Sequence, residues 1–421
     1  MSSIRVTFRI VHVPIIALSF FAGSLPAAAQ EPVYYTMLKG EMADYGATPW
    51  FTEDILVGKS IMNFTLDTGT TLLWATSDEC ITAACEPHHK VNSTQPGFVW
   101  LEQPDPPIEV NFGPWGVMDV WIAEAPFVGP EPAPSLNLTF DASVSYTGPK
   151  FQYLTWDGGI GFPSESQSVM RNDFYFEAFV EATGLPAVFS TYTADATGRG
   201  AFVLGGVDLA MIDPTSEVVL EPLKSPVEFD LWGTPLAQFS VGLTQLPELS
   251  GQVFFVDSGS SRFKGDQTYI YPILNELLTY TDDVGSPIFE KYYEDLDGVN
   301  AWTGLQYVTG GPTDHPNLPS FTLELGRSCG GDENSHLSIQ LSPEQYSYYV
   351  DVGDRTGQWV AAVHVLDGVG GLLVGATFMD LVHVTFNYET SIPGVLSQGN
   401  MSLHRKTEGL QPQSYLCVMD G

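Results

Sequence analysis

Short apolar runs of strand length, bounded by turn residues, recur along most of the 421-residue chain. Glycine (41 residues), proline (30 residues) and aromatic residues are frequent, whereas helical periodicity is scarce. This pattern is typical of all-β architectures. Two short helices are expected, at about 173–183, where Gly184 and Pro186 follow, and at about 271–280, where Pro272 would open the helix.

One internal repeat stands out from this pattern. LDTGTT at 66–71 has a counterpart in VDSGSS at 256–261, and strand-like residues precede each. Further along the chain, each acid is followed by an apolar-Gly-apolar turn, at 159–162 and at 373–376. The chain therefore reads as two diverged halves that meet near residue 215. We expect an N-terminal lobe over residues 30–215 with the first acid, and a C-terminal lobe over residues 216–421 with the second.

The first 29 residues have the pattern of a secretory signal peptide. Two arginines precede an apolar stretch that runs to about Ala22, and three alanines at 27–29 offer a cleavage site. A membrane anchor is the alternative, but the stretch contains Pro14 and is shorter than the roughly 18 apolar residues that a span needs. Cleavage near Ala29 would yield a secreted, extracellular protein.

The charge balance excludes some partners. The chain has 16 Lys+Arg against 50 Asp+Glu, a formal net charge of -34. Such an excess of carboxylates repels nucleic acid and anionic membranes and keeps a protein soluble at neutral pH. A solvated acidic surface and an adaptation to an acidic medium both fit the sequence pI of about 4.2. We therefore expect no nucleic-acid or membrane partner, and a monomer.

All four cysteines follow the predicted signal peptide. In an oxidising compartment an even number of cysteines suggests two disulfides. Of the three possible pairings, one joins Cys80 and Cys85 in a small loop and leaves Cys329 to pair with Cys417. Metal binding is the alternative, but no pair has ligand spacing and no histidine cluster joins them.

Four Asn-x-Ser/Thr sequons are candidate glycosylation sites in an exported protein. Asn63 lies in an expected strand, so it is the least suited to modification. The other three are Asn92, Asn137 and Asn400.

The repeated acids suggest a specific chemistry. One Asp-Thr/Ser-Gly triplet is weak evidence, but two in equivalent places of two halves are not. If Asp67 and Asp257 meet, they cannot both ionise, so they share a proton. One acid can then take a proton from water while the other gives one to a carbonyl oxygen, and an amide is hydrolysed without a metal or other cofactor. Gly69 and Gly259 would let the backbone approach closely.

The chain resembles the pepsin-like aspartic peptidases. The resemblance extends from about residue 34 to 390 and includes DTGTTLLW with Trp74, WDGGIGF at 156–162, GRGAFVLGGVD at 198–208 and LLVGATF at 372–378. It implies a bilobal β fold with few short helices, whose two pseudo-twofold-related lobes surround an active-site cleft. An extended polypeptide substrate would bind there by strand-like hydrogen bonds, beneath a hairpin flap.

The same resemblance assigns roles to individual residues. Asp67 and Asp257 would be the catalytic pair of a secreted endopeptidase that works at acidic pH. The residues expected to support the pair are Thr68, Gly69, Thr70, Ser258, Gly259 and Ser260, with Trp74, Phe112 and Gly113 at the flap and cleft.

The flap region, IEVNFGPWGVMDVW at 108–121, departs from the family pattern. Phe112 stands where the family has a tyrosine, so the hydroxyl that could bond the indole of Trp74 is lost. Pro114 and Trp115 replace small residues at the flap tip. These changes indicate a stiffer, more apolar lid, and the alternative is a divergent hairpin that aligns differently.

Two further departures concern charge and length. Arg262 and Lys264 follow the second triplet where the first half has Leu72 and Trp74. Either a cation there favours the ionised form of Asp257, or both are solvated surface charges, which is the reading we favour because they lie in an expected turn. The stretch between Ala29 and the first acid leaves no room for a separate propeptide, which indicates an enzyme without a zymogen stage or an incomplete start.

Two functions follow from these observations. The first is an aspartic endopeptidase, favoured because both acids and both adjacent glycines are present. The second is a non-catalytic relative that keeps the cleft for binding or for inhibiting another enzyme, suggested by the altered flap and the missing propeptide.

Overall fold

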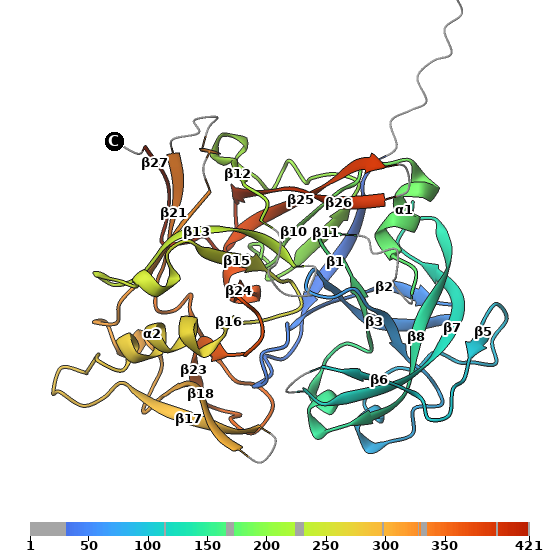
Figure 1. The fold of residues 1–421 in the computed structure, drawn as a ribbon, viewed down its shortest axis with the longest axis horizontal. Helices are drawn as coiled ribbons and strands as arrows, with labels where there is room; N and C mark the ends of the chain where they lie inside the picture. The colour runs from blue at the N-terminus through green and yellow to red at the C-terminus, as the bar shows by residue number, and fades with distance from the viewer. Residues whose placement is uncertain are drawn as a thin grey trace, which may run out of the picture. The chain divides into compact units, whose positions relative to one another are not determined.

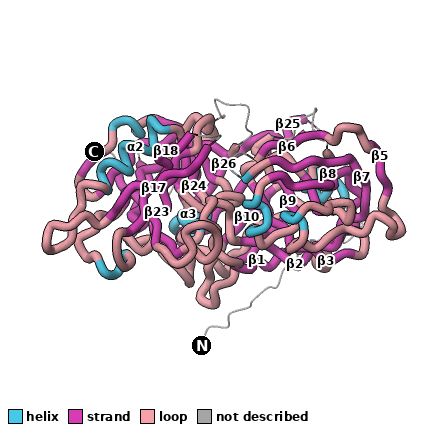
Figure 2. The backbone as a smooth tube through the Cα atoms, turned by 90° about the horizontal axis from the view of Figure 1, so that it is seen from below, coloured by secondary structure: helices cyan, strands magenta, loops and turns pink. Residues whose placement is uncertain are grey.

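Strands dominate the described part of the chain in this computed structural model, and three short α-helices accompany them (Figures 1 and 2). The all-β fold class is therefore confirmed. The predicted signal peptide, residues 1–29, lies outside the described residues. The structure describes residues 31–419 except 113–114, 166–171, 224–230, 297–298, 327, 330–334 and 393–394. The helices are α1 (Tyr175–Thr183), α2 (Gln267–Leu277) and α3 (Ala376–Met379).

The first sheet holds most strands of the N-terminal half, and among the described residues it has fifteen strands. In chain order they are β1 (Val33–Lys39), β2 (Trp50–Val57), β3 (Ser60–Asp67), β4 (Leu73–Thr76), β5 (Val99–Glu102), β6 (Ile108–Asn111), β7 (Val117–Val128), β8 (Ser135–Thr147), β9 (Gly158–Gly161), β10 (Val188–Tyr192), β11 (Gly200–Leu204), β12 (Val218–Leu220), β20 (Ser328–Cys329), β25 (Val382–Ile392) and β26 (Val395–Arg405).

The second sheet belongs entirely to the C-terminal half, with twelve strands in the described part of the chain. They are β13 (Trp232–Val241), β14 (Thr244–Gln245), β15 (Gln252–Val256), β16 (Phe263–Gly265), β17 (Phe289–Leu296), β18 (Val299–Tyr307), β19 (Phe321–Leu325), β21 (Ser335–Leu341), β22 (Ser347–Tyr349), β23 (Trp359–Val365), β24 (Leu372–Val374) and β27 (Ser414–Met419).

Two strands from the end of the chain join the first sheet. β25 pairs with β10, and β26 pairs with β25 and β12, so C-terminal residues extend a sheet built mainly by the N-terminal half. In Figure 1 they lie along the top, next to β10 and β11. The boundary near residue 215 stays a prediction, but the two halves share this sheet.

Alternation of apolar and polar residues explains how the strands pack. In β21 the side chains of Leu337, Ile339 and Leu341 are fully buried, whereas the residues between them are partly exposed. Central strands such as β24 are buried on both faces, which is why their sequences are apolar without interruption.

An aromatic cluster lies where the halves meet. Phe189 of β10 packs on Phe386 of β25, with ring centroids 4.6 Å apart, and on Trp232 of β13 at 5.8 Å. The indole of Trp232 also donates a hydrogen bond to the carbonyl of Phe162 (2.9 Å). Aromatic pairs of this kind stabilise beyond the area they bury, so this cluster joins the two halves near the central sheet.

The first helix was predicted correctly and the start of the second was not. α1 ends at Gly184, whose positive φ of 68° suits glycine. α2 begins at Gln267, so Pro272 lies inside the helix instead of opening it. The helix continues through the proline because Ile270, Ile273 and their neighbours form a buried apolar face that compensates for the lost backbone hydrogen bond.

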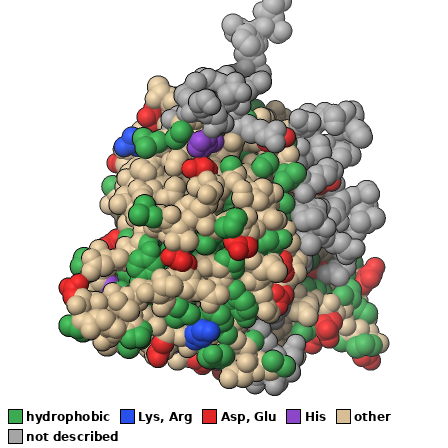
Figure 3. Space-filling view, turned by 60° about the vertical axis from the view of Figure 1, so that its left-hand side comes forward, with side chains coloured by type: hydrophobic (Ala, Val, Ile, Leu, Met, Phe, Trp, Pro, Cys, Tyr) green, Lys and Arg blue, Asp and Glu red, His purple; other side chains and the backbone are tan. Residues whose placement is uncertain are grey.

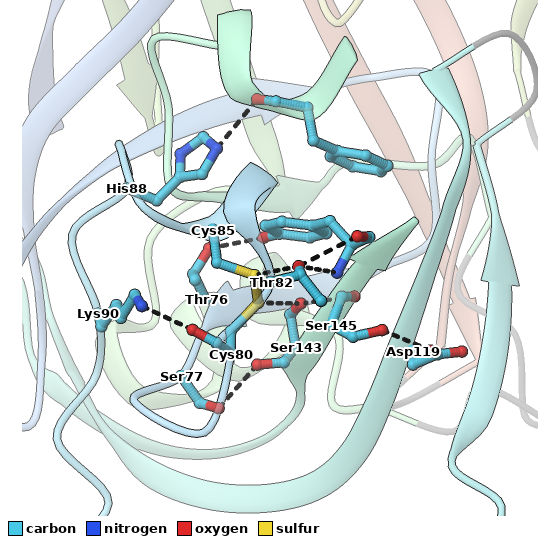
Figure 4. The surroundings of a disulfide bond; sticks show 12 residues. Thr76, Ser77, Cys80, Thr82, Cys85, His88, Lys90, Asp119, Ser143 and Ser145 are labelled. Atoms are coloured by element: carbon cyan, nitrogen blue, oxygen red, sulfur yellow. Dashed lines mark hydrogen bonds between the residues drawn. A yellow bond between two sulfur atoms is a disulfide. The ribbon is translucent and has the colours of Figure 1, made fainter. Parts of the chain in front are cut away.

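One of the two predicted disulfides is confirmed. Cys80 and Cys85 are bonded and fully buried, and Figure 4 shows Thr82 and Ser143 beside the bridge. The side chains of Cys329 and Cys417 lie outside the described residues, so the second pairing stays a prediction.

The sequon asparagines differ in their surroundings. Asn63 donates to the carbonyl of Thr155 (3.0 Å) within β3, in keeping with the doubt about its modification. Asn92 and Asn137 are exposed, and Asn400 is partly buried. Glycosylation of these sites stays a prediction.

A matched pair of leucines tests the core. Leu323→Ala removes a fully buried side chain from β19, whereas Leu243→Ala removes a fully exposed one from the turn after β13. We expect Leu323→Ala to lower the free energy of unfolding by about 2–5 kcal/mol, and Leu243→Ala to change it by less than about 0.5 kcal/mol. Urea unfolding of both variants measures this, and equal effects would contradict the described core.

Candidate active site

The two repeated acids lie at equivalent strand ends. Asp67 closes β3, which runs parallel to β9, and Asp257 directly follows β15, which runs parallel to β24. The apolar-Gly-apolar segments of the repeat therefore pair with the strands that carry the acids. The backbone N–H of Phe162 donates to the carbonyl of Asp67 (2.7 Å), and that of Asp257 donates to the carbonyl of Val374 (2.9 Å).

The structure brings the two carboxyl groups together against each other's glycine. A Cβ atom added to Gly259 would lie 2.2 Å from Cγ of Asp67, and one added to Gly69 would lie 2.4 Å from Oδ1 of Asp257. Each glycine N–H also donates to the acid of its own triplet, at 2.7 Å for Asp67 and 2.8 Å for Asp257. Only glycine fits both positions, since any side chain would collide with the opposite acid.

Crossed hydrogen bonds between the middle residues of the triplets hold the loops. The hydroxyl of Thr68 donates to the carbonyl of Val256 (3.1 Å) and accepts from the N–H of Ser258 (2.9 Å). The hydroxyl of Ser258 donates to the carbonyl of Leu66 (2.6 Å) and accepts from the N–H of Thr68 (2.9 Å). Each half therefore fixes the loop of the other, which limits the movement of both acids.

The third residues of the triplets differ between the halves. The Ser260 hydroxyl contacts Oδ2 of Asp257 at 2.5 Å, whereas the Thr70 hydroxyl accepts from the N–H of Leu72 (3.2 Å). The two acids therefore have unequal surroundings.

Burial and the neighbouring Asp257 carboxylate raise the pKa of Asp67 well above its usual value, although the hydrogen bond from Gly69 acts to lower it.

Arg262 and Lys264 are buried, so the reading of both as surface charges is wrong. Arg262 is 0% exposed and Lys264 is 6% exposed. Lys264 lies in β16, between β23 and β24, and Arg262 directly precedes this strand. The repeat could have predicted the burial of Lys264, because this residue occupies the position of Trp74 in the first half, and Trp74 is buried.

Arg262 has partners from distant parts of the chain, whereas Lys264 has a partner close in sequence. The guanidinium of Arg262 donates to the hydroxyl of Tyr292 (2.6 Å) and lies 3.8 Å from Asp44. The ammonium of Lys264 donates to Ser260 (3.0 Å). The face in Figure 3 shows many acidic and few basic side chains, and these two of the 16 basic residues lie inside the protein.

The expected flap hairpin is present. β6 and β7 pair antiparallel, and the N–H of Phe112 donates to the carbonyl of Gly116 (3.0 Å) across the tip. Phe112 packs on Trp74 with ring centroids 5.7 Å apart, which fits its assignment to the tyrosine position. Gly113 and Pro114 lie outside the described residues.

Trp115 fastens the flap in a way that the sequence did not reveal. Its indole N–H donates to the carbonyl of Tyr45 (3.2 Å), and its ring is nearly parallel to Phe112 at 6.0 Å and 5.6 Å from Trp156. A tryptophan in a hairpin tip was the available signal, but its partner lies in a loop 70 residues earlier. The flap therefore has a polar anchor although the tyrosine hydroxyl is missing.

The family model for eukaryotic aspartyl proteases matches residues 51–395 of the chain. The chain belongs to this family. This aspartyl protease is accordingly a hydrolase, an aspartic endopeptidase that acts on peptide substrates. Within the described ranges, no group of three or more His, Cys, Asp or Glu side chains is arranged to hold a metal ion.

Relatives of this aspartyl protease include gastricsins and a yeast enzyme. Gastricsin of Oryctolagus cuniculus is 25% identical over 308 residues, which cover 71% of this chain and 75% of the relative. Gastricsin of Homo sapiens is 25% identical over 302 residues, covering 68% and 72%. An aspartic protease of Phaffia rhodozyma is 25% identical over 337 residues, covering 78% and 74%.

The crossed hydrogen bonds predict a specific loss of stability. Thr68→Val keeps the shape of the side chain but leaves the N–H of Ser258 without its acceptor, so the free energy of unfolding should fall by about 1–3 kcal/mol. Thr65→Val is the matched control, because the Thr65 hydroxyl, in the strand β3 just before Thr68, is buried without a described hydrogen-bond partner. Urea unfolding that shows equal losses for both variants would contradict the bonds described.

The pKa of Asp67 predicts how stability depends on pH. Above its unfolded pKa of about 3.9 the unfolded chain releases a proton that folded Asp67 retains, so stability falls as pH rises towards the folded pKa. Asp67→Asn cannot ionise, so it should be more stable than the wild type at pH 7 and similar to it at pH 3. Unfolding at both pH values measures this, and a difference that is independent of pH would contradict the assignment.

Proposed function

We propose that this aspartyl protease cleaves peptide bonds with a water molecule activated between Asp67 and Asp257. The observation that supports the proposal is the close approach of each acid to the glycine of the opposite triplet, because two carboxyl groups held near each other would share one proton. The ionised acid takes a proton from the water, the water oxygen bonds the carbonyl carbon, and the other acid gives its proton to the carbonyl oxygen. In the tetrahedral diol that results, the acid that took the proton of the water gives it to the amide nitrogen and the C–N bond breaks, while the other acid takes a proton from a diol hydroxyl. The products are a carboxylic acid and an amine, and the pair returns to its starting protonation without a covalent intermediate.

The shared proton favours work at acidic pH. The mechanism needs one acid protonated and one ionised, and this state is lost once both acids ionise. The raised pKa of Asp67 extends the state with one protonated acid to higher pH. As the pH falls towards the pI of about 4.2, the net negative charge of the chain and its self-repulsion also decrease. An endopeptidase active in acid is therefore supported by both the site and the whole chain.

Substrates would lie extended between the flap and the acids. Phe112 and Trp115 of the hairpin tip pack with Trp74 in an aromatic cluster, which would suit apolar side chains of a peptide. The lobes over residues 30–215 and 216–421 would each contribute one acid to a monomeric enzyme. The competing idea of a non-catalytic binding protein rested on the altered flap, whereas the intact acids and glycines support catalysis.

Secretion is supported by the signal-like N-terminus and by the Cys80–Cys85 disulfide, since such bonds persist in oxidising compartments. In the part of the chain that the structure describes, none of the helices has the length and apolarity needed to cross a membrane.

Replacing either acid tests the mechanism. Asp67→Asn and Asp257→Asn should each lower the cleavage of an unfolded protein between about pH 2 and 6 by roughly 10²–10⁴-fold or more, because each removes one partner of the proton transfer. Asp213→Asn is a control outside the site, because Asp213 caps a single 3-10 turn at Pro214–Ser216, where asparagine serves equally well. Full activity of either active-site variant would refute the proposal.

A further inference from the structure

A buried lysine lies behind the second acid and contacts it through one hydroxyl. Lys264 donates to Oγ of Ser260 at 3.0 Å, and the same oxygen lies 2.5 Å from Oδ2 of Asp257. The first half has no equivalent arrangement, since Trp74 occupies the position of Lys264 and Thr70 accepts from the backbone of Leu72. Here the two otherwise similar halves differ in charge.

The chemistry of these groups fixes the direction of the hydrogen bonds. An ammonium group has three donors and no acceptor, so Ser260 must accept from Lys264. The single hydroxyl proton of Ser260 is then available to Oδ2 of Asp257, which must accept it. An unprotonated carboxylate is the form that accepts best, and its hydrogen bond with a donor is strengthened by its charge.

Nearby acids other than the catalytic pair already have partners other than Lys264. Asp44 lies 3.0 Å from Arg355 and 3.8 Å from Arg262, and Glu294 lies 2.8 Å from His364 and 3.7 Å from Arg355. The charge of Lys264 therefore acts mainly on the pair. The titratable and charged groups around Lys264 and its neighbour Arg262 are Asp67, Asp257, Asp44, Tyr292, Glu294, Tyr348, Arg355 and His364.

Lys264 and Glu294 keep their charges in acid. Burial lowers the pKa of Lys264 to about 8, and Asp257 counteracts this, so the ammonium remains charged below neutral pH. Although burial opposes it, the hydrogen bond with His364 lowers the pKa of Glu294 far below its usual value, so Glu294 stays ionised. Burial lowers the pKa of His364, although the hydrogen bond with Glu294 acts to raise it.

We propose that Lys264 is a positioning residue that acts through Ser260, holds Asp257 as the ionised member of the pair and leaves the shared proton on Asp67. Asp257 is then the base that takes the proton of the water, and Asp67 is the acid that protonates the carbonyl oxygen. The buried cation also shifts the working range of the enzyme to lower pH. This inference rests on the proposed function of the two acids.

The sign of the effect follows from electrostatics. A cation stabilises the ionised forms of nearby acids, so removing it raises the pH at which each step of the pair titrates. Lys264→Gln should therefore move both steps, and both limbs of the activity profile, upward by roughly one pH unit or more. A merely structural role would lower activity or stability without moving the profile.

The experiment measures ionisation directly, independently of cleavage. Carboxyl carbon NMR of protein labelled at aspartate, with Asp67→Asn and Asp257→Asn to assign the two signals, gives the titration of the pair. In the wild type Asp257 should ionise at the lower pH, and in Lys264→Gln its titration should move upward. Unchanged titration, or Asp67 ionising first in the wild type, would overturn the proposal.

The chain offers a matched control. Lys406 is also buried, its pKa is also lowered to about 8 by burial, and it donates to the carbonyls of Thr193 and Asp380. Lys406→Gln should leave the titration of the pair where it is. Lys264→Arg keeps the charge and should retain a titration close to that of the wild type.

Two further outcomes separate the possible failures. If Lys264→Gln does not fold, Ser260→Ala removes the connecting hydroxyl, and the titration of Asp257 should still rise. An unchanged titration in that variant overturns the proposal. If the titrations behave as expected but the wild type cleaves no protein at any pH, the proposed function fails while the role of Lys264 stands.

Discussion

Two carboxyl groups in close contact resist being charged at the same time, and the structure around the triplets holds them close together. Glycine follows each acid at a distance of two residues because the opposite acid occupies the space of a side chain. The crossed bonds of Thr68 and Ser258 resist separation of the loops. Sharing a proton would relieve the repulsion between the acids, so under the proposed mechanism the contact that costs stability at neutral pH would also provide an acid and a base together.

Such a contact requires that strand pairing and packing hold the two halves in fixed positions. β25 and β26 come from the end of the chain but extend the sheet of the N-terminal half. Phe189, Trp232 and Phe386 pack together at that junction. In addition, the loop before β2 reaches the second triplet, where the N–H of Thr48 donates to the carbonyl of Gly259 (3.0 Å). The precision of the site therefore depends on long-range packing as well as on the triplets themselves.

Sequence patterns revealed the features that depend on local order. The strand-like residues before each acid, the glycine after it and the cysteines of the small loop are close in sequence, so a pattern could identify them. The surroundings of Arg262 could not be identified in this way, because its partners Asp44 and Tyr292 come from other segments. The burial of Lys264 was missed for the same reason, since β23 and β24, which pair with its strand, come much later in the chain. The same reason explains why the bond from Trp115 to Tyr45 was missed. The start of α2 was predicted wrongly from Pro272, because the tertiary burial of the helix outweighed the local preference of proline for a first turn.

Divergence of the two halves has a chemical consequence. In a symmetric pair the shared proton would have no preferred site, and each acid would serve equally as acid or base. Here the glycine contacts and the N–H donors remain alike, whereas the residues behind them differ: an indole at Trp74 and an ammonium at Lys264. The strands that carry these two residues keep the same pairings, since β4 lies between β8 and β9 as β16 lies between β23 and β24. A single buried charge in a conserved geometry is therefore sufficient to make two similar acids chemically different.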